Sequence, residues 1–292
     1  MTSNILLPDG ATKIATDPDG SSRHYQKVKI GHGVDATFND LTLATPMPVG
    51  WGALNASRGA GGTIPVVVYG RRNVDTTYDF LNDLNSLGYL TTAATMRVKA
   101  GGNANDTAAG TGTREVTIYG VDENFALQAE AVATAGALAS AATTTTYTRV
   151  YHIKDTSNGT IRGTNAAAIT VEDGAGAADH LRMPVSTGVG VSGLYTVPAA
   201  HTAYPVGLTV TVDAKKAFSF RIMTAEGANL TSAPFKPAIL YREWLGIEDA
   251  LLIDNPRAFP PIPALTDIWI QALAIGTTAE ITATFSLMIV PN

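Results

Sequence analysis

The sequence of 292 residues contains no cysteine. Disulfide bonds, thiolate nucleophiles and cysteine-ligated zinc sites are therefore excluded, and the fold must be stable without covalent cross-links. Hydrophobic residues make up 45% of the chain, which is enough to build a large core. The length also exceeds the usual size of a single core, so it predicts more than one domain.

Charged residues are scarce as well, at 15% of the chain against about 25% in typical globular proteins. The formal net charge is −5, and the only adjacent basic pairs are Arg71-Arg72 and Lys215-Lys216. Because phosphate contacts need clustered Lys and Arg, the composition predicts no nucleic-acid partner. In place of charged residues the chain has many Thr, Ala, Gly, Asn and Ser residues. A surface with so few charges repels neighbouring molecules only weakly.

Long apolar runs are also missing. No stretch approaches the roughly 18 apolar residues that a membrane-spanning helix needs. The ILL run at residues 5–7 is too short for the apolar region of a signal peptide. We therefore expect a soluble protein that is made without export and has no membrane partner.

Motifs that carry chemistry are few, and each has a simpler structural explanation. The segment GVGVSG at 188–193 has the spacing of a dinucleotide-binding loop, but LYTVPAAHTAYP follows it and does not predict the required helix. The five histidines are scattered and lack the spacing of a metal site. The sequence predicts no catalytic residue, no metal and no cofactor.

What the chain does contain is the alternation of apolar and polar residues that is typical of β-strands. In residues 113–121, Val116 and Ile118 alternate with Thr117 and Tyr119, and threonine is well suited to a pleated strand. The other predicted elements are strands at 64–70, 127–131 and 143–153, hairpins at 207–223 and 267–290, and a proline-rich crossing between sheets at 255–267.

These elements predict an all-β protein with two β-sandwich or jelly-roll-like domains behind an extended N-terminal arm. The expected boundaries are 1–50 for the arm, 51–190 for the first sandwich and 191–292 for the jelly-roll-like second sandwich. One short helix is expected at 75–88, where Asp75 could cap it and Phe80, Leu84 and Leu87 have helical spacing.

The arm has too little apolar surface to form a core of its own. It contains turn signals and one predicted strand, RHYQKVKI at 23–30, so we expect it to lie on a neighbouring molecule by strand addition. Two aromatic residues of the last domain are expected to contribute to contacts as well. The predicted interface residues are Tyr25, Val28, Ile30, Tyr241 and Trp244.

Several segments resemble a class of virion structural proteins of tailed bacteriophages, many of them from marine phages. The segments are MRVKAGGNANDTAAGTGTREVTIYGVDEN, TTTTYTRVYHI, GTNAAAITVEDG, LYTVPAAHTAYPVG and IPALTDIWIQALA, and the resemblance covers residues 92–292. It implies a non-enzymatic component of the virion, assembled in the host cytoplasm. It carries over no active-site residue.

We expect a capsid decoration or cement protein that bridges capsid subunits, with the major capsid protein or other virion proteins as partners and a trimer or dimer of its own. A head fibre and a tail or connector component are the structural alternatives. A carbohydrate-binding module could use Trp244, Trp269 or Tyr241. A polysaccharide depolymerase could use Glu243 or Glu248, which lie near Trp244, although we favour a packing or interface role for that tryptophan.

Overall fold

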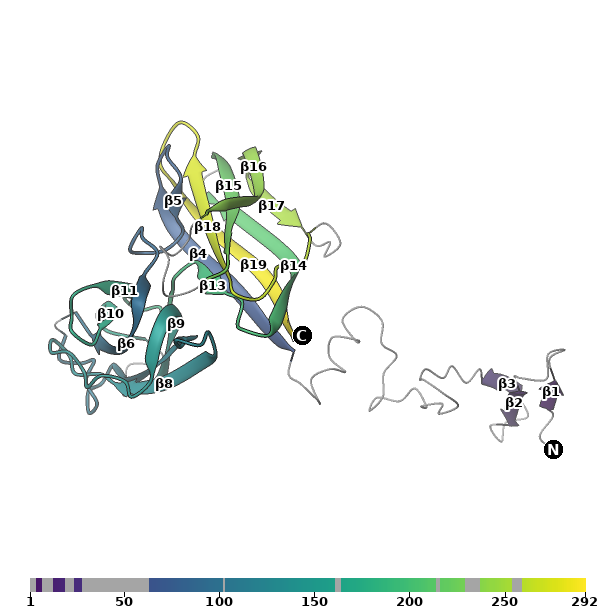
Figure 1. The fold of residues 1–292 in the computed structure, drawn as a ribbon, viewed down its shortest axis with the longest axis horizontal. Coiled ribbons are helices and arrows are strands. Elements are labelled where there is room, and N and C mark those ends of the chain that lie inside the picture. Colours follow the sequence, from purple (N-terminus) through teal and green to yellow (C-terminus); the bar gives the residue numbers. More distant parts are fainter. Residues whose placement is uncertain are drawn as a thin grey trace. The chain divides into compact units, whose positions relative to one another are not determined.

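The computed structural model describes residues 63–101, 103–160, 164–213, 216–228, 237–253 and 259–292, together with three short strands nearer the N-terminus. The chain divides into two units, Met1–Thr63 and Ile64–Asn292. Figure 1 shows strands as the regular elements, and no helix occurs within the described ranges. The prediction of an all-β protein with several antiparallel sheets is confirmed.

The N-terminal unit contains a small antiparallel sheet. Its strands are β1 (Asn4–Leu6), β2 (Lys13–Pro18) and β3 (His24–Lys27), in the order β1-β2-β3. β3 lies where the sequence predicts a strand, whereas β1 and β2 are additional. Val28 and Ile30, the two interface predictions that follow β3, lie outside the described residues.

Ile64–Asn292 includes a sandwich of two antiparallel sheets. One sheet has the order β17 (Ala250–Ile253), β14 (His201–Val212), β19 (Ala279–Pro291) and β4 (Ile64–Val74). The other has the order β13 (Leu194–Thr196), β18 (Thr266–Ala274), β15 (Ala217–Glu226) and β16 (Ile239–Glu248), and β5 (Asp79–Phe80) also pairs with β18. We call this the second sandwich.

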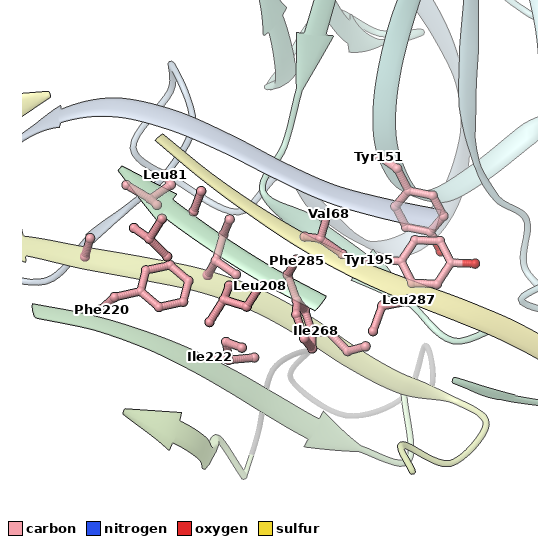
Figure 2. Packing of buried hydrophobic residues seen from close by; sticks show 14 of the residues in the cluster. Val68, Leu81, Tyr151, Tyr195, Leu208, Phe220, Ile222, Ile268, Phe285 and Leu287 are labelled. Carbon is pink, nitrogen blue, oxygen red and sulfur yellow. The ribbon is translucent and has the colours of Figure 1, made fainter. Parts of the chain in front are cut away.

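The core of the second sandwich lies between these two sheets. Leu208 of β14 and Phe285 of β19 pack in one buried cluster with Phe220 and Ile222 of β15 and Ile268 of β18 (Figure 2). All five side chains are almost completely buried. The alternation predicted for residues 281–289, with apolar side chains inward and Thr or Ser outward, is confirmed in β19.

The predictions of hairpins at 207–223 and 267–290 are wrong. β14 pairs with β17 and β19, whereas the next strand, β15, pairs with β16 and β18. β18 and β19 are divided between the sheets in the same way. Inward alternation is the same in a hairpin and in two strands that face each other across a core, so the pattern could not separate them. The predicted crossing at 255–267 does connect β17 of one sheet to β18 of the other.

The first sandwich is a seven-stranded sheet that closes over a core of its own. Its order is β11 (Asp179–Met183), β10 (Ile169–Asp173), β6 (Tyr89–Lys99), β9 (Thr146–Asn158), β7 (Thr113–Val121) and β8 (Leu127–Ala133), and β12 (Val189–Val191) pairs with β9. Residues of β6, β7, β9, β10 and β11 share one buried cluster. Val116 and Ile118 belong to it, as their alternation predicts.

The helix predicted at 75–88 is absent, and this prediction was wrong. The segment forms β5 and a series of turns. The Asn82 side chain donates to the carbonyl oxygens of Ser86 at 2.9 Å and Ser192 at 2.7 Å, and Asn85 has a φ of 52°. Short polar side chains that bond to the backbone compete with helix formation, and here they outweigh the spacing of three apolar residues.

The first domain boundary differs from the predicted one. β4 and β5 precede the first sandwich in sequence but pair with β19 and β18, so residues 64–80 belong to the second sandwich rather than to 51–190. The two sandwiches also share buried contacts. Tyr151 of β9 packs on Tyr195 of β13, with ring centroids 4.7 Å apart, and Arg149 of β9 forms a fully buried ion pair with Asp267 of β18.

Candidate interaction site

A groove of about 1240 Å³ runs along β4, between the second sandwich and strands β7, β8, β9 and β12 of the first. We call it the β4 groove. Val67 of β4 is 56% exposed and contributes to one wall, and Leu127, Val185 and Val189 form exposed apolar parts of the other. The groove therefore presents valine and leucine side chains to solvent from both sandwiches.

Aromatic rings also line the β4 groove. The rings of Tyr119 and His152 are stacked, with centroids 4.1 Å apart and planes 6° apart. Tyr151 and Tyr195 contribute from the buried side, and burial raises the pKa of Tyr195 well above its usual value. The Tyr195 hydroxyl is buried without a hydrogen-bond partner. The groove thus has aromatic as well as aliphatic side chains in its lining.

The backbone of β4 adds a second kind of contact. β4 is the last strand of its sheet and pairs only with β19 in the described sheet order. In an antiparallel edge strand, every second residue directs its N–H and C=O away from the neighbouring strand. Nearly all of β4 lines the groove, so these backbone groups lie along it.

Further exposed aliphatic side chains lie on β16 and β17, each of which is the last strand of its sheet in the described order. Ile239, Leu240 and Leu245 of β16 and Leu252 of β17 are all exposed, Leu252 to 73%. We call these four residues the apolar edge. Edge strands are usually protected by charge, proline or a covering segment, so four exposed aliphatic side chains here indicate a contact surface.

The predicted interface residues Tyr241 and Trp244 lie on β16, beside the apolar edge. Both are partly buried against the core of the second sandwich. Tyr241 stacks on Phe259 and donates its hydroxyl hydrogen to the carbonyl oxygen of Pro260, and burial raises its pKa to about 12. Trp244 packs against Phe220 and Phe259. The third predicted aromatic, Tyr25, lies in β3 opposite Asp17 and away from these two in sequence.

Sequence reasoning missed the exposed aliphatic residues of both surfaces. The run IPVVV at 64–68 predicts a buried strand, yet Val67 is exposed because its side chain lies on the outer face of the sheet, where it pairs with the outward residue Ser286 of β19. Leu245 and Leu252 lie in segments whose alternation gives no sign of which strand ends a sheet. Strand order depends on pairing between distant segments, so no local signal could have identified these residues.

Three residues considered for sugar binding or hydrolysis do not have the required positions. Trp269, one of the aromatic residues considered for sugar binding, is 4% exposed and packs with Leu194 and Ala225. Glu243 and Glu248 lie opposite Arg221 and Ala217 of β15, which are four positions apart. The Cα atoms of residues four positions apart on a strand are separated by about 13 Å, which is wider than the roughly 5–9.5 Å between the two carboxyl groups of a glycosidase.

The remaining motifs have structural roles. Residues 188–193 contain β12 and lead into β13, so the helix of a dinucleotide-binding loop does not follow. Among the described residues, no three His, Asp or Glu side chains lie close enough together to hold a metal ion. The described part of the chain likewise has no helix that is long and apolar enough to cross a membrane.

Two partly or fully buried histidines make the fold sensitive to acid. Burial lowers the pKa of His152, and Lys154 lowers it further. Burial also lowers the pKa of His180, and nearby Asp173 and Asp179 offset this only in part. The Nε2 atom of His180 has no hydrogen-bond partner within the buried interior. In both cases burial disfavours the charged form of the imidazole.

Acidification from about pH 7.5 to about pH 5.5 should lower the melting temperature. Below the ordinary histidine pKa of about 6.5 the unfolded chain binds protons that the folded chain does not, so stability falls as the pH decreases. His180→Gln should reduce this fall, because glutamine stays neutral throughout. Melting followed by circular dichroism at both pH values tests this, and an equal fall in the two proteins would contradict it.

Comparison of the chain with protein-family models, with curated proteins and with solved structures finds no match. The resemblance to phage virion proteins therefore stays a prediction, and the function is inferred from the residues and surfaces described above.

Proposed function

We propose that this chain is a non-enzymatic structural component of a tailed bacteriophage virion, and specifically a capsid decoration protein. It would bridge neighbouring capsid subunits and so stabilise the shell, since a protein that binds only the assembled shell favours it by mass action. Its partners would be the major capsid protein and further copies of itself, in a dimer or trimer about a local axis.

The apolar edge carries this proposal. A β-sandwich is compatible with many functions, so the fold by itself does not specify one. Leu245 and Leu252, however, are 69% and 73% exposed on two edge strands that follow each other in sequence, in a chain with few charged residues. Exposure of aliphatic side chains to water is unfavourable in free energy, and contact with another protein removes this unfavourable exposure. The sequence segments that resemble phage virion proteins support the assignment to a particle.

Changing Leu245 and Leu252 together to Glu should weaken binding to the particle by at least about tenfold. Burial of a leucine side chain contributes about 1.5–3 kcal/mol, and a tenfold change in affinity corresponds to about 1.4 kcal/mol. Cosedimentation of purified protein with particles that lack it measures the effect. Leu138→Glu is the matched control, because Leu138 is 74% exposed but lies outside the apolar edge. Unchanged binding of the double variant would contradict the proposal.

A further inference from the structure

The β4 groove has the size and chemistry of a peptide-binding site. Its volume of about 1240 Å³ is larger than that of most small-molecule pockets, which is about 300–1,000 Å³. One side offers the backbone edge of β4, an 11-residue strand that has no second partner strand among the described residues. An extended segment that pairs with such an edge gains backbone hydrogen bonds, and its alternate side chains enter pockets on either side.

The apolar walls indicate which side chains would fit. Val67 lies on the β4 side, and Val185, Val189 and Leu127 lie on the other, all of them exposed. The charged residues Arg71, Arg72, Asp83 and Glu280 also line the groove, and their charges sum to zero. The groove therefore suits an extended segment with small β-branched side chains and no requirement for strong net charge.

The N-terminal unit supplies such a segment. β3 is the last strand in the described order β1-β2-β3, so one of its edges has no partner among the described strands. In the sequence that continues from it, HYQKVKI at 24–30, Val28 and Ile30 fall on the same face as His24 and Gln26 if the strand continues. The edge of β3 in one copy and the edge of β4 in another could therefore pair and form one continuous sheet.

The length of the N-terminal unit allows it to reach another molecule. It joins the rest of the chain at Ile64, which is itself part of the groove lining. Residues 28–63 can span at most about 120 Å when extended. A compact body of the size of Ile64–Asn292 has a radius of gyration of only about 17 Å. The connection is therefore long enough for β3 to reach a groove on a neighbouring copy.

The segment directly before β4 is a poor alternative occupant. To pair with β4 it would have to fold back as the partner strand of a hairpin. Residues 45–62 contain Pro46 and Pro48 and five glycines at 50, 52, 59, 61 and 62. Proline and glycine are both unfavourable in a paired strand. A strand-forming segment further from β4 fits the groove better.

We propose that the β4 groove of one copy binds the edge strand β3 and the following residues, up to Ile30, of a second copy. The added strand would extend the sheet β17-β14-β19-β4, with Val28 and Ile30 against the apolar walls. This inference rests on the proposed function for its biological setting, because strand exchange would connect neighbouring copies on a particle. The contact itself can be tested without any particle.

A photo-cross-linking amino acid at position 67 tests the proposal on the purified full-length chain. Equal amounts of ¹⁴N-labelled and ¹⁵N-labelled protein are mixed, irradiated and analysed by mass spectrometry. We expect cross-links from position 67 to residues within 24–30, with about half of the peptide pairs joining a light to a heavy chain. Cross-links within single copies only, cross-links confined to residues 64–292, or none at all would each overturn the proposal.

A point variant gives an independent measurement. Val67→Glu should weaken self-association about tenfold, because a charge replaces an apolar contact of the size of one valine. Its side chain is largely exposed, so folding should be unaffected. Leu138→Glu is the control and should leave the sedimentation-equilibrium constant unchanged. Equal constants for both variants would contradict strand binding in the groove, whereas the particle-binding assay of the apolar edge would be unaffected by that result.

Discussion

Replacing Arg149 by Met should destabilise the protein by about 3–5 kcal/mol, because the change leaves Asp267 charged and buried without its partner. Arg149 and Asp267 have side-chain exposures of 0% and 1%, and the Nη2 and Oδ2 atoms are 3.1 Å apart. A second contact joins Nε to Oδ1 at 3.3 Å, and Thr196 also donates to this carboxylate. Urea unfolding followed by tryptophan fluorescence measures the loss.

An exposed ion pair in the same protein is the control. The Nη2 atom of Arg71 and the Oε1 atom of Glu280 are 2.6 Å apart, but the two side chains are 57% and 42% exposed. Breaking this pair with Arg71→Met should lower the free energy of unfolding by less than about 1 kcal/mol. The double variant Arg149→Met, Asp267→Leu should recover most of the stability, since no buried charge remains. A loss in the single variant no larger than that of Arg71→Met would contradict this account of the buried ion pair.

Gly120→Ala should cost about 3 kcal/mol or more and weaken the pairing of β7 with β9. A Cβ atom at this position would overlap the carbonyl oxygen of Arg149 and come within 2.9 Å of Cδ1 of Tyr147. The obstacle is backbone, so no rotamer change can remove it. The strands would have to separate beside the buried ion pair, where both sandwiches meet.

Gly207→Ala is the matched control for this steric effect. Gly207 lies on β14, and the nearest heavy atom to a Cβ there is the carbonyl oxygen of Ile253 at 3.6 Å, which is an ordinary contact. The change in unfolding free energy should be below about 1 kcal/mol. Equal losses in the two variants would mean that the close approach at Gly120 does not determine the stability of the β7–β9 pair.

The sequence predicts the class of fold and many of its strands, because alternation is a local property. Val116, Ile118 and the inward residues of β19 are found where the pattern places them. The strand predicted at 143–153 is found as β9, in which Tyr147, Arg149 and Tyr151 are all buried. Arginine is rarely buried. Arg149 can be buried in β9 because it forms an ion pair with Asp267, which is distant in sequence.

Pairing between distant segments is what the sequence leaves undetermined. Inward alternation at Leu208 and Phe220 fits both a hairpin and two strands on opposite sheets. In the same way, nothing local distinguishes Val67 on an edge strand from a buried valine. The wrong prediction of a helix at 75–88 has a different cause. Hydrogen bonds from the Asn82 side chain to backbone carbonyl oxygens favour turns there, although the apolar residues have helical spacing.

The number of copies of this chain per particle tests the central claim most directly. Quantitative mass spectrometry of purified virions, with the most abundant capsid protein as the reference, gives that number. A decoration protein that bridges capsid subunits should be present in copies on the order of hundreds, in a fixed ratio to the shell. About 3–20 copies would contradict decoration and favour a fibre, tail or connector component. Absence from the particle would contradict a virion role altogether.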